Sequence, residues 1–143
     1  MRLVSCIREL SDTLDDWERY LDIPLEQLKS DRDTRNMVFH AMLVSIQSSI
    51  DIATEIIAMK GLRRPASYRD TFGILAEEGI LTLDIARPLS DLAGFRNVLV
   101  HIYWDLDLVQ VYGILQRDLP LLQRFLSEMK IFAHTNTTSG TEI

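Results

Sequence analysis

Cysteine is almost absent from this chain of 143 residues, whose single thiol is Cys6. One cysteine cannot form an internal disulfide, so the sequence excludes a small secreted scaffold held by disulfides. A chain of this length can bury enough apolar surface in one core to fold without a disulfide or a metal. We therefore expect a single domain in a reducing compartment.

Long apolar segments are also missing. Charged residues are spread through the first twenty positions, where a signal peptide would need an unbroken apolar core. No run of about 18 apolar residues occurs, as a membrane-spanning helix would require. The sequence therefore predicts a soluble protein of the cytoplasm.

Positive charge is in deficit, because 15 lysine and arginine residues face 21 acidic residues and give a net charge of −6. Such a protein does not attract nucleic acid through its overall field, since phosphate binding needs local positive charge. A local cluster does exist, because Arg63, Arg64 and Arg69 follow Lys60 with no acidic residue between them. These three arginines are candidate RNA-binding residues, although a solvated helix end and loop explains the cluster more simply.

Glycine and proline are sparse, with six and four residues, and apolar residues recur at intervals of three and four. This spacing is typical of helices that bury one face. The pattern predicts helices over residues 3–21, 33–60, 67–78, 82–101 and 105–132, with bends at Pro88 and Pro120. We expect an antiparallel bundle of four to five helices in one domain over residues 1–133. The polar tail, residues 134–143, is predicted to be disordered.

The end of the helix predicted over residues 82–101 carries side chains suited to phosphodiester chemistry, namely Arg96, Asn97, His101 and Tyr103. Asn97 and His101 are four residues apart and would share one face of a helix. The long side chain of Arg96 could reach the same side. The carboxyl end of a helix also favours a positively charged imidazole.

Each of these residue types has a role in cleaving RNA. A histidine can take a proton from a ribose 2′-hydroxyl or give one to the leaving oxygen. An arginine fits a phosphate and stabilises charge in the transition state, and an asparagine can orient the histidine or bind the phosphate. No metal is needed, and the sequence offers no convincing metal site. An isolated arginine and histidine near a helix end more often form a cap and a salt bridge, and Tyr103 can be a packed aromatic residue.

The string Gly94-Phe95-Arg96-Asn97-Val98-Leu99-Val100-His101-Ile102-Tyr103 resembles the R-x4-H-x-Y motif of the HepT-like proteins. These proteins are a branch of the HEPN superfamily of helical RNases. The similarity includes Ser49-Ile50-Asp51-Ile52-Ala53 and the segments 61–72 and 75–79. Residues from about 35 to 126 fit the family's pattern in order.

The resemblance implies a HEPN-like helical bundle that pairs as a homodimer, with two copies of the motif facing one cleft. It implies a metal-independent endoribonuclease without a cofactor, which acts as the toxin of a type VII toxin–antitoxin pair. Arg96 and His101 would match the family's catalytic residues, with Asn97 in support. Superfamily sites often include an acidic residue from another helix, for which Asp51 is the candidate.

The resemblance also implies a means of control. Tyr103 would match the tyrosine that the partner, a MntA-type minimal nucleotidyltransferase antitoxin, modifies with AMP from ATP. A bulky anion beside a phosphate-binding cleft would block RNA through charge and volume.

Two other functions stay open. The same bundle could be a non-catalytic subunit that binds a nucleotide or serves as a scaffold for a partner nucleotidyltransferase, which the acidic net charge favours. It could also be a purely structural dimer. His101 could in principle bind a metal with Asp105 and Asp107, but either aspartate is explained more simply as the N-cap of the next helix.

Overall fold

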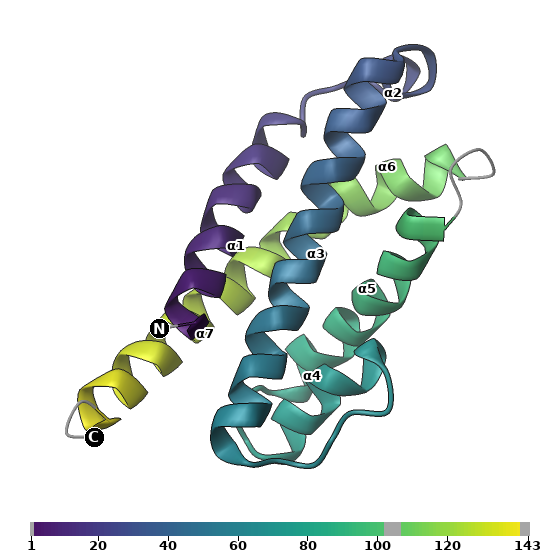
Figure 1. The fold of residues 1–143 in the computed structure, drawn as a ribbon. Coiled ribbons are helices and arrows are strands. Elements are labelled where there is room, and N and C mark those ends of the chain that lie inside the picture. The colour runs from purple at the N-terminus through teal and green to yellow at the C-terminus, as the bar shows by residue number, and fades with distance from the viewer. Residues whose placement is uncertain (1, 102–106, 141–143) are drawn as a thin grey trace.

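A computed structural model describes residues 2–101 and 107–140 of the chain, and the side chains in these ranges except those of residues 101 and 137–140. Within the described residues all regular structure is helical (Figure 1). The helices are α1 (Arg2–Arg19), α2 (Leu25–Ser30), α3 (Arg32–Lys60), α4 (Tyr68–Glu77), α5 (Leu83–His101), α6 (Leu108–Arg117) and α7 (Leu119–Gly140). The predicted all-α class is confirmed.

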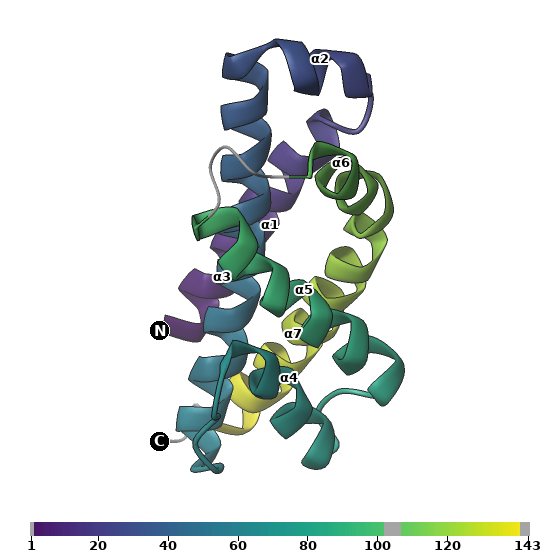
Figure 2. The ribbon, with the colours of Figure 1, turned by 90° about the vertical axis from the view of Figure 1, so that its right-hand side faces the viewer.

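The long helix α3 is the centre of the bundle and contacts α1, α2, α4 and α5. Helix α1 lies along α3, and α7 packs against both α1 and α5. Figure 2 shows the short helices α2 and α4 at opposite ends of the molecule. This arrangement brings the second half of α5 against the middle of α3, where the candidate site lies.

Apolar residues on one face of each helix form the core, as the spacing predicts. In α1 the buried stripe includes Leu3, Leu10 and Trp17, which are at most 1% exposed. The indole nitrogen of Trp17 donates a hydrogen bond of 2.8 Å to the carbonyl oxygen of Leu115, so α1 is also tied to α6 by a polar contact. A buried indole N–H requires such a partner.

Capping residues stabilise the helix ends. Gly61 ends α3 with a φ of 62°, a left-handed conformation that favours glycine. Ser67 begins α4, where its side chain accepts a hydrogen bond from the backbone N–H of Asp70. Asp107 caps α6 in the same way, accepting from the backbone N–H groups of Val109 and Gln110. The N-cap role of Asp107 is thereby confirmed.

Three features differ from the sequence-based expectation. Helix α2 lies between the first two predicted ranges. The last predicted helix is divided at Asp118 into α6 and α7, and Pro120 is the second residue of α7. A proline has no N–H for the i−4 carbonyl, so it is accommodated in a first turn more readily than inside a continuous helix. Helix α7 also continues through Gly140, whereas we expected disorder from residue 134. The side chain of Asn136 supports this extension by donating a 2.8 Å hydrogen bond to the carbonyl oxygen of Phe132.

Helix α3 has the length and hydropathy that a membrane-spanning helix would need, with a mean hydropathy of 1.4 in its most apolar window. Of that window, 56% is buried inside the protein, against neighbouring helices. The apolar composition of α3 is thus explained by its position in the core of a helical bundle.

Candidate functional site

Three helices supply contacts to Arg96 of α5, which is partly buried. Its Nε donates a hydrogen bond of 2.7 Å to Oε1 of Gln47 on α3. Its guanidinium carbon lies 4.9 Å from the centre of the Tyr68 ring at the start of α4, a cation–π contact. One Nη1 proton reaches Oδ1 of Asn97 at 3.3 Å. The arginine is therefore held in one orientation by residues far apart in the sequence.

Asp51 belongs to the same network, although it does not touch Arg96 directly. The side-chain nitrogen of Gln47 donates a hydrogen bond of 2.9 Å to Oδ1 of Asp51, one turn further along α3. Gln47 thus joins the guanidinium of Arg96 to the carboxylate of Asp51. The acidic residue predicted for the site lies close to it, but the contact is made through an amide.

The two remaining motif residues are only partly covered by the described structure. His101 is the last residue of α5, so its backbone lies one helical turn beyond Asn97 on the same face. Its side chain is not described. Tyr103 lies outside the described residues.

Two of the three arginines in the predicted basic cluster form ion pairs with acidic residues. Arg63 binds two acidic residues of α4, with contacts of 2.8 Å to Asp70 and 2.7 Å to Glu77. The hydrogen bond from Arg63 lowers the pKa of Asp70 to about 2. Arg69 pairs with Asp91 at 3.2 Å. Arg64 is exposed and has no ion pair with any residue that the structure describes.

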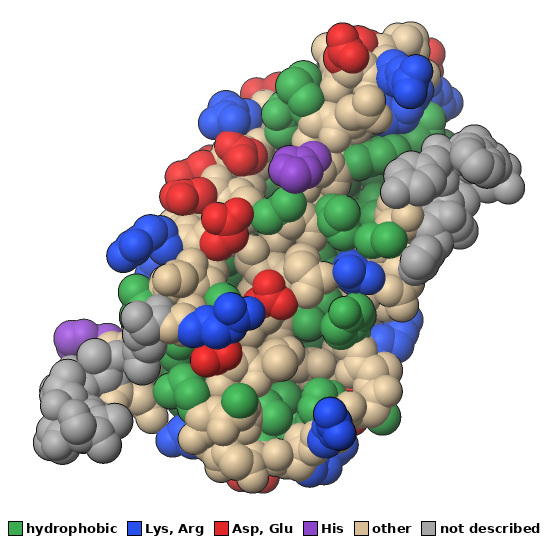
Figure 3. Space-filling view, in the orientation of Figure 1, with side chains coloured by type: hydrophobic (Ala, Val, Ile, Leu, Met, Phe, Trp, Pro, Cys, Tyr) green, Lys and Arg blue, Asp and Glu red, His purple; other side chains and the backbone are tan. Residues whose placement is uncertain are grey.

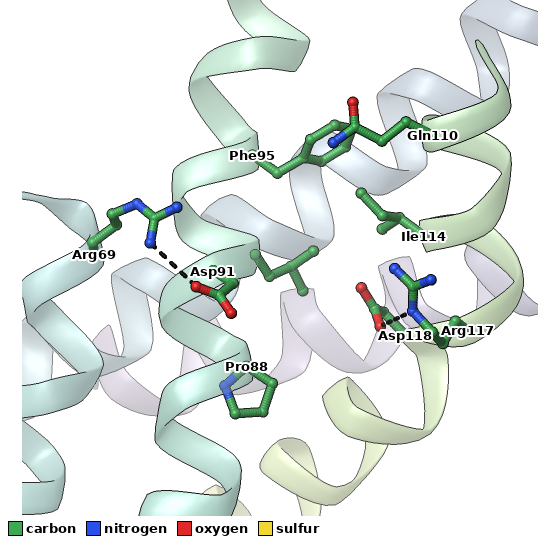
Figure 4. A pocket seen from close by; sticks show the side chains of 9 residues that line it. Arg69, Pro88, Asp91, Phe95, Gln110, Ile114, Arg117 and Asp118 are labelled. Atoms are coloured by element: carbon green, nitrogen blue, oxygen red, sulfur yellow. Dashed lines mark hydrogen bonds and ion pairs between the residues drawn. The ribbon is translucent and has the colours of Figure 1, made fainter. Parts of the chain in front are cut away.

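A separate cavity of about 400 Å³ lies between α5 and α6 (Figure 4). Its apolar part includes Leu92, Phe95 and Ile114. The Arg69–Asp91 pair borders it, and a second pair of opposite charge joins Arg117 to Asp118 at 3.5 Å. Burial raises the pKa of Asp118. Neither Arg96 nor its partners line this cavity, so it is distinct from the candidate site.

Comparison with known proteins assigns the chain to a family. Residues 10–129 match the family described as "Ribonuclease HepT-like". The chain belongs to this HepT-like family. The match includes all the described residues around Arg96, and it confirms the resemblance seen in the sequence.

Individual relatives support the assignment. The mRNA nuclease HepT of Shewanella oneidensis is 31% identical over 104 residues, which cover 73% of this chain and 78% of that protein. The tRNA nuclease HepT of Aphanizomenon flos-aquae is 27% identical over 99 residues, 69% of this chain and 67% of the relative. A solved structure of a tri-AMPylated Shewanella oneidensis HEPN toxin, in complex with an MNT antitoxin, superposes with a TM-score of 0.80. The two sequences are 26% identical, and the superposition covers 90% of this chain and 96% of the toxin chain.

Gln47 and Tyr68 were not predicted as site residues. Tyr68 lies in a segment that resembles the HepT-like proteins, but no motif links it to Arg96, and the contact arises only when α4 folds against α5. Gln47 has one local signal, since it precedes Asp51 by four residues and so shares its helix face. That spacing predicts a pair on α3, but not the arginine 49 residues later.

Proposed function

We propose that this chain is a metal-independent endoribonuclease, the toxin of a type VII toxin–antitoxin pair, and that it acts in the cytoplasm. Membership of the HepT-like family and the names of its nuclease relatives support the activity. The observation that carries the proposal is the fixed guanidinium of Arg96, five residues before His101 on the same helix. The Nη2 group of Arg96 has no hydrogen bond to a described residue, and we assign it to the binding of a phosphate.

The proposed reaction needs only the chain's own residues. His101 takes the proton from a ribose 2′-hydroxyl, and the 2′-oxygen attacks the adjacent phosphorus. The bond to the 5′-oxygen breaks, and that oxygen leaves with a proton supplied by an imidazolium. Arg96 stabilises the negative charge that gathers on the phosphate oxygens in the transition state. The products are a 2′,3′-cyclic phosphate and a 5′-hydroxyl end.

We further propose that two copies of the chain form the working enzyme. A shallow groove of about 200 Å³ runs between α3 and α5 beside the end of α5. Its lining residues are mostly apolar: Asn36, Phe39, His40, Leu43, Leu99 and Val100. Figure 3 shows apolar side chains gathered between these two helices on one face of the molecule. A second copy covering this face would bring two Arg96 side chains toward one cleft.

The proposed partner is a MntA-type nucleotidyltransferase antitoxin that transfers AMP from ATP to the hydroxyl of Tyr103. The similarity to a tri-AMPylated HEPN toxin in complex with an MNT antitoxin supports this assignment. The test is the intact mass of the chain after incubation with the antitoxin and ATP. We expect one or more additions of AMP, none of them in Tyr103→Phe. AMP on that variant would show that the site is another residue.

The decisive experiment for the proposed function is RNA cleavage by the purified chain in the presence of EDTA. Removing a group that stabilises the transition state costs about 100-fold or more in kcat, so Arg96→Ala and His101→Ala should be nearly inactive. The exposed Arg8→Ala variant is the matched control and should cleave normally. Full activity in both site variants would refute the mechanism.

One observation favours a second function, a non-catalytic subunit that binds a nucleotide or supports a partner enzyme. Two of the three arginines predicted to bind RNA, Arg63 and Arg69, are already paired with acidic residues. This function predicts binding of ATP or RNA without cleavage. Titration with labelled RNA and with ATP, alongside the cleavage assay, separates the two functions.

A further inference from the structure

We propose that Gln47 is the positioning residue of this site, and that it fixes the plane of the Arg96 guanidinium so that the Nη2 edge faces the substrate phosphate. This inference rests on the proposed function, because it gives Arg96 its role in cleavage. It adds a residue of α3 that does not touch the RNA and acts only through Arg96.

The hydrogen bonds on the two sides of Gln47 determine its orientation. Its amide nitrogen donates to Asp51 at 2.9 Å, so its amide oxygen points toward α5 and accepts the Nε–H of Arg96 at 2.7 Å. An inverted amide would place an N–H group against a guanidinium, which has no acceptor, and an oxygen against a carboxylate. Asp51 therefore acts on Arg96 indirectly, because its hydrogen bond fixes the orientation of the Gln47 amide.

Three contacts then restrict Arg96. Gln47 holds Nε, Asn97 takes one proton of Nη1, and the ring of Tyr68 lies against the guanidinium carbon. The planar guanidinium of Arg96, held at one edge and on one face, has few accessible orientations. It therefore loses less conformational freedom on binding a phosphate than an unrestrained guanidinium would. The edge that stays open among the described residues is Nη2, which suits an anion.

A neutral amide at this position preserves the charge of the arginine. A carboxylate at residue 47 would form a direct ion pair with Arg96 and compete with the phosphate for it. It would also stand beside Asp51, a second negative charge one turn away, and would lose the donor that Asp51 accepts. Glutamine supplies the acceptor that orients Arg96, and it neither competes with the phosphate as an anion nor repels Asp51.

The test compares Gln47→Leu, Gln47→Glu and the native chain in steady-state RNA cleavage. For Gln47→Leu we expect kcat to fall by about 10- to 100-fold with little change in KM, because a misplaced guanidinium loses contacts made in the transition state. For Gln47→Glu we expect KM to rise, because the new carboxylate competes for Arg96. Gln123→Leu, an exposed glutamine of α7, is the matched control and should leave both constants unchanged.

A second measurement does not depend on activity. The Nε–H resonance of Arg96 in an NMR spectrum, assigned by its loss in Arg96→Lys, should exchange slowly with water in the native chain and faster in Gln47→Leu. In an Arg96→Ala background, Gln47→Leu should cause no further loss of cleavage, since Gln47 acts only through Arg96.

The outcomes separate this inference from the proposed function. If the native chain does not cleave RNA, the proposed function fails, and the resonance still reports whether Gln47 holds Arg96. If Arg96→Ala is inactive while Gln47→Leu keeps both its kcat and its Nε–H exchange rate, the positioning role is refuted and the function stands. A loss of kcat in Gln47→Leu with an unchanged Nε–H exchange rate also refutes the positioning role, because Gln47 would then affect cleavage without holding Arg96. Thermal unfolding of each variant, monitored by circular dichroism, confirms that the compared chains are folded.

Discussion

Arginine side chains in this protein carry the same charge but differ in what they can bind. Arg63 is held by two carboxylates and Arg69 by one, so a phosphate would have to displace an existing partner. Arg96 is held by a neutral amide and an aromatic ring, so its charge is uncompensated by these contacts. Arg64 is exposed in the loop between α3 and α4. At the scale of the residue, the partner determines whether an arginine serves structure or binding.

This difference predicts how RNA binding responds to salt. Arg64→Ala should weaken the binding of single-stranded RNA and reduce the slope of log affinity against log salt concentration by about 0.7, the value for one lost phosphate contact. Arg69→Ala should change the slope less, because Arg69 is already paired with Asp91. Fluorescence anisotropy at several salt concentrations measures both slopes. A slope that changes only in Arg69→Ala would mean that the ion pair opens to bind RNA.

The sequence indicated candidate site residues, but not the contacts that they make. Arg96, Asn97 and Asp51 do lie near one another, as the resemblance implied, because α3 and α5 pack side by side. The ion pairs of the basic cluster are not apparent from neighbours in the sequence. The acids that neutralise Arg63 and Arg69 come from α4 and α5, between 7 and 22 residues away in sequence. Contacts of this kind depend on tertiary packing, which helical periodicity does not specify.

At the scale of the element, helix α4 depends on polar contacts at its first turn. It has 10 residues, a length that is marginal for an isolated helix. Ser67 caps it, and Asp70 accepts hydrogen bonds from the backbone N–H of Ala66 and from Arg63 of the preceding loop. Since Tyr68 begins this helix and contacts Arg96, the same turn that stabilises α4 also positions one wall of the site.

These contacts predict a dependence of stability on pH. The pKa of Asp70 is lowered to about 2 from 3.8, chiefly by the hydrogen bond from Arg63, so the folded state favours the charged carboxylate. The stabilisation is complete above the unfolded pKa and is lost as the pH falls toward 2. Because the pair is partly exposed, we expect Asp70→Asn to lower the free energy of unfolding by about 1 kcal/mol near pH 7. Denaturant unfolding between pH 7 and pH 2 should show this difference narrowing below about pH 4.

The matched control for this prediction is Asp12→Asn, which changes an exposed aspartate of α1 that has no ion pair with a described residue. The free energy of unfolding of Asp12→Asn should differ little from that of the native chain, and the difference should not change with pH. If the free energy of unfolding of Asp70→Asn still differs from that of the native chain by the same amount at pH 2, the charge of Asp70 is not what stabilises the turn.

At the scale of the whole molecule, the candidate site lies at the edge of one bundle rather than inside it. Arg96 is reached from α3, α4 and α5, and the neighbouring groove between α3 and α5 has a largely apolar lining. Helical periodicity explains which residues each helix buries in the core of the bundle. Phe39 and Leu43 pack partly against this core and also line the groove, so part of their apolar surface is left for the proposed second chain to cover.

The proposed homodimer can be tested at this groove. Leu43→Glu would place a charge in the interface, and burying an unpaired charge is costly. We expect the dimer dissociation constant to rise by at least about 10-fold, equivalent to about 1.4 kcal/mol, with a matching loss of RNA cleavage at low protein concentration. Ile131→Glu, at a residue of α7 that is 66% exposed, is the control and should leave the dimer intact. Light scattering after size-exclusion chromatography measures the mass of each species. If Leu43→Glu stays dimeric and active while the native chain is a dimer, the second copy binds elsewhere, and the two Arg96 side chains do not meet across this groove.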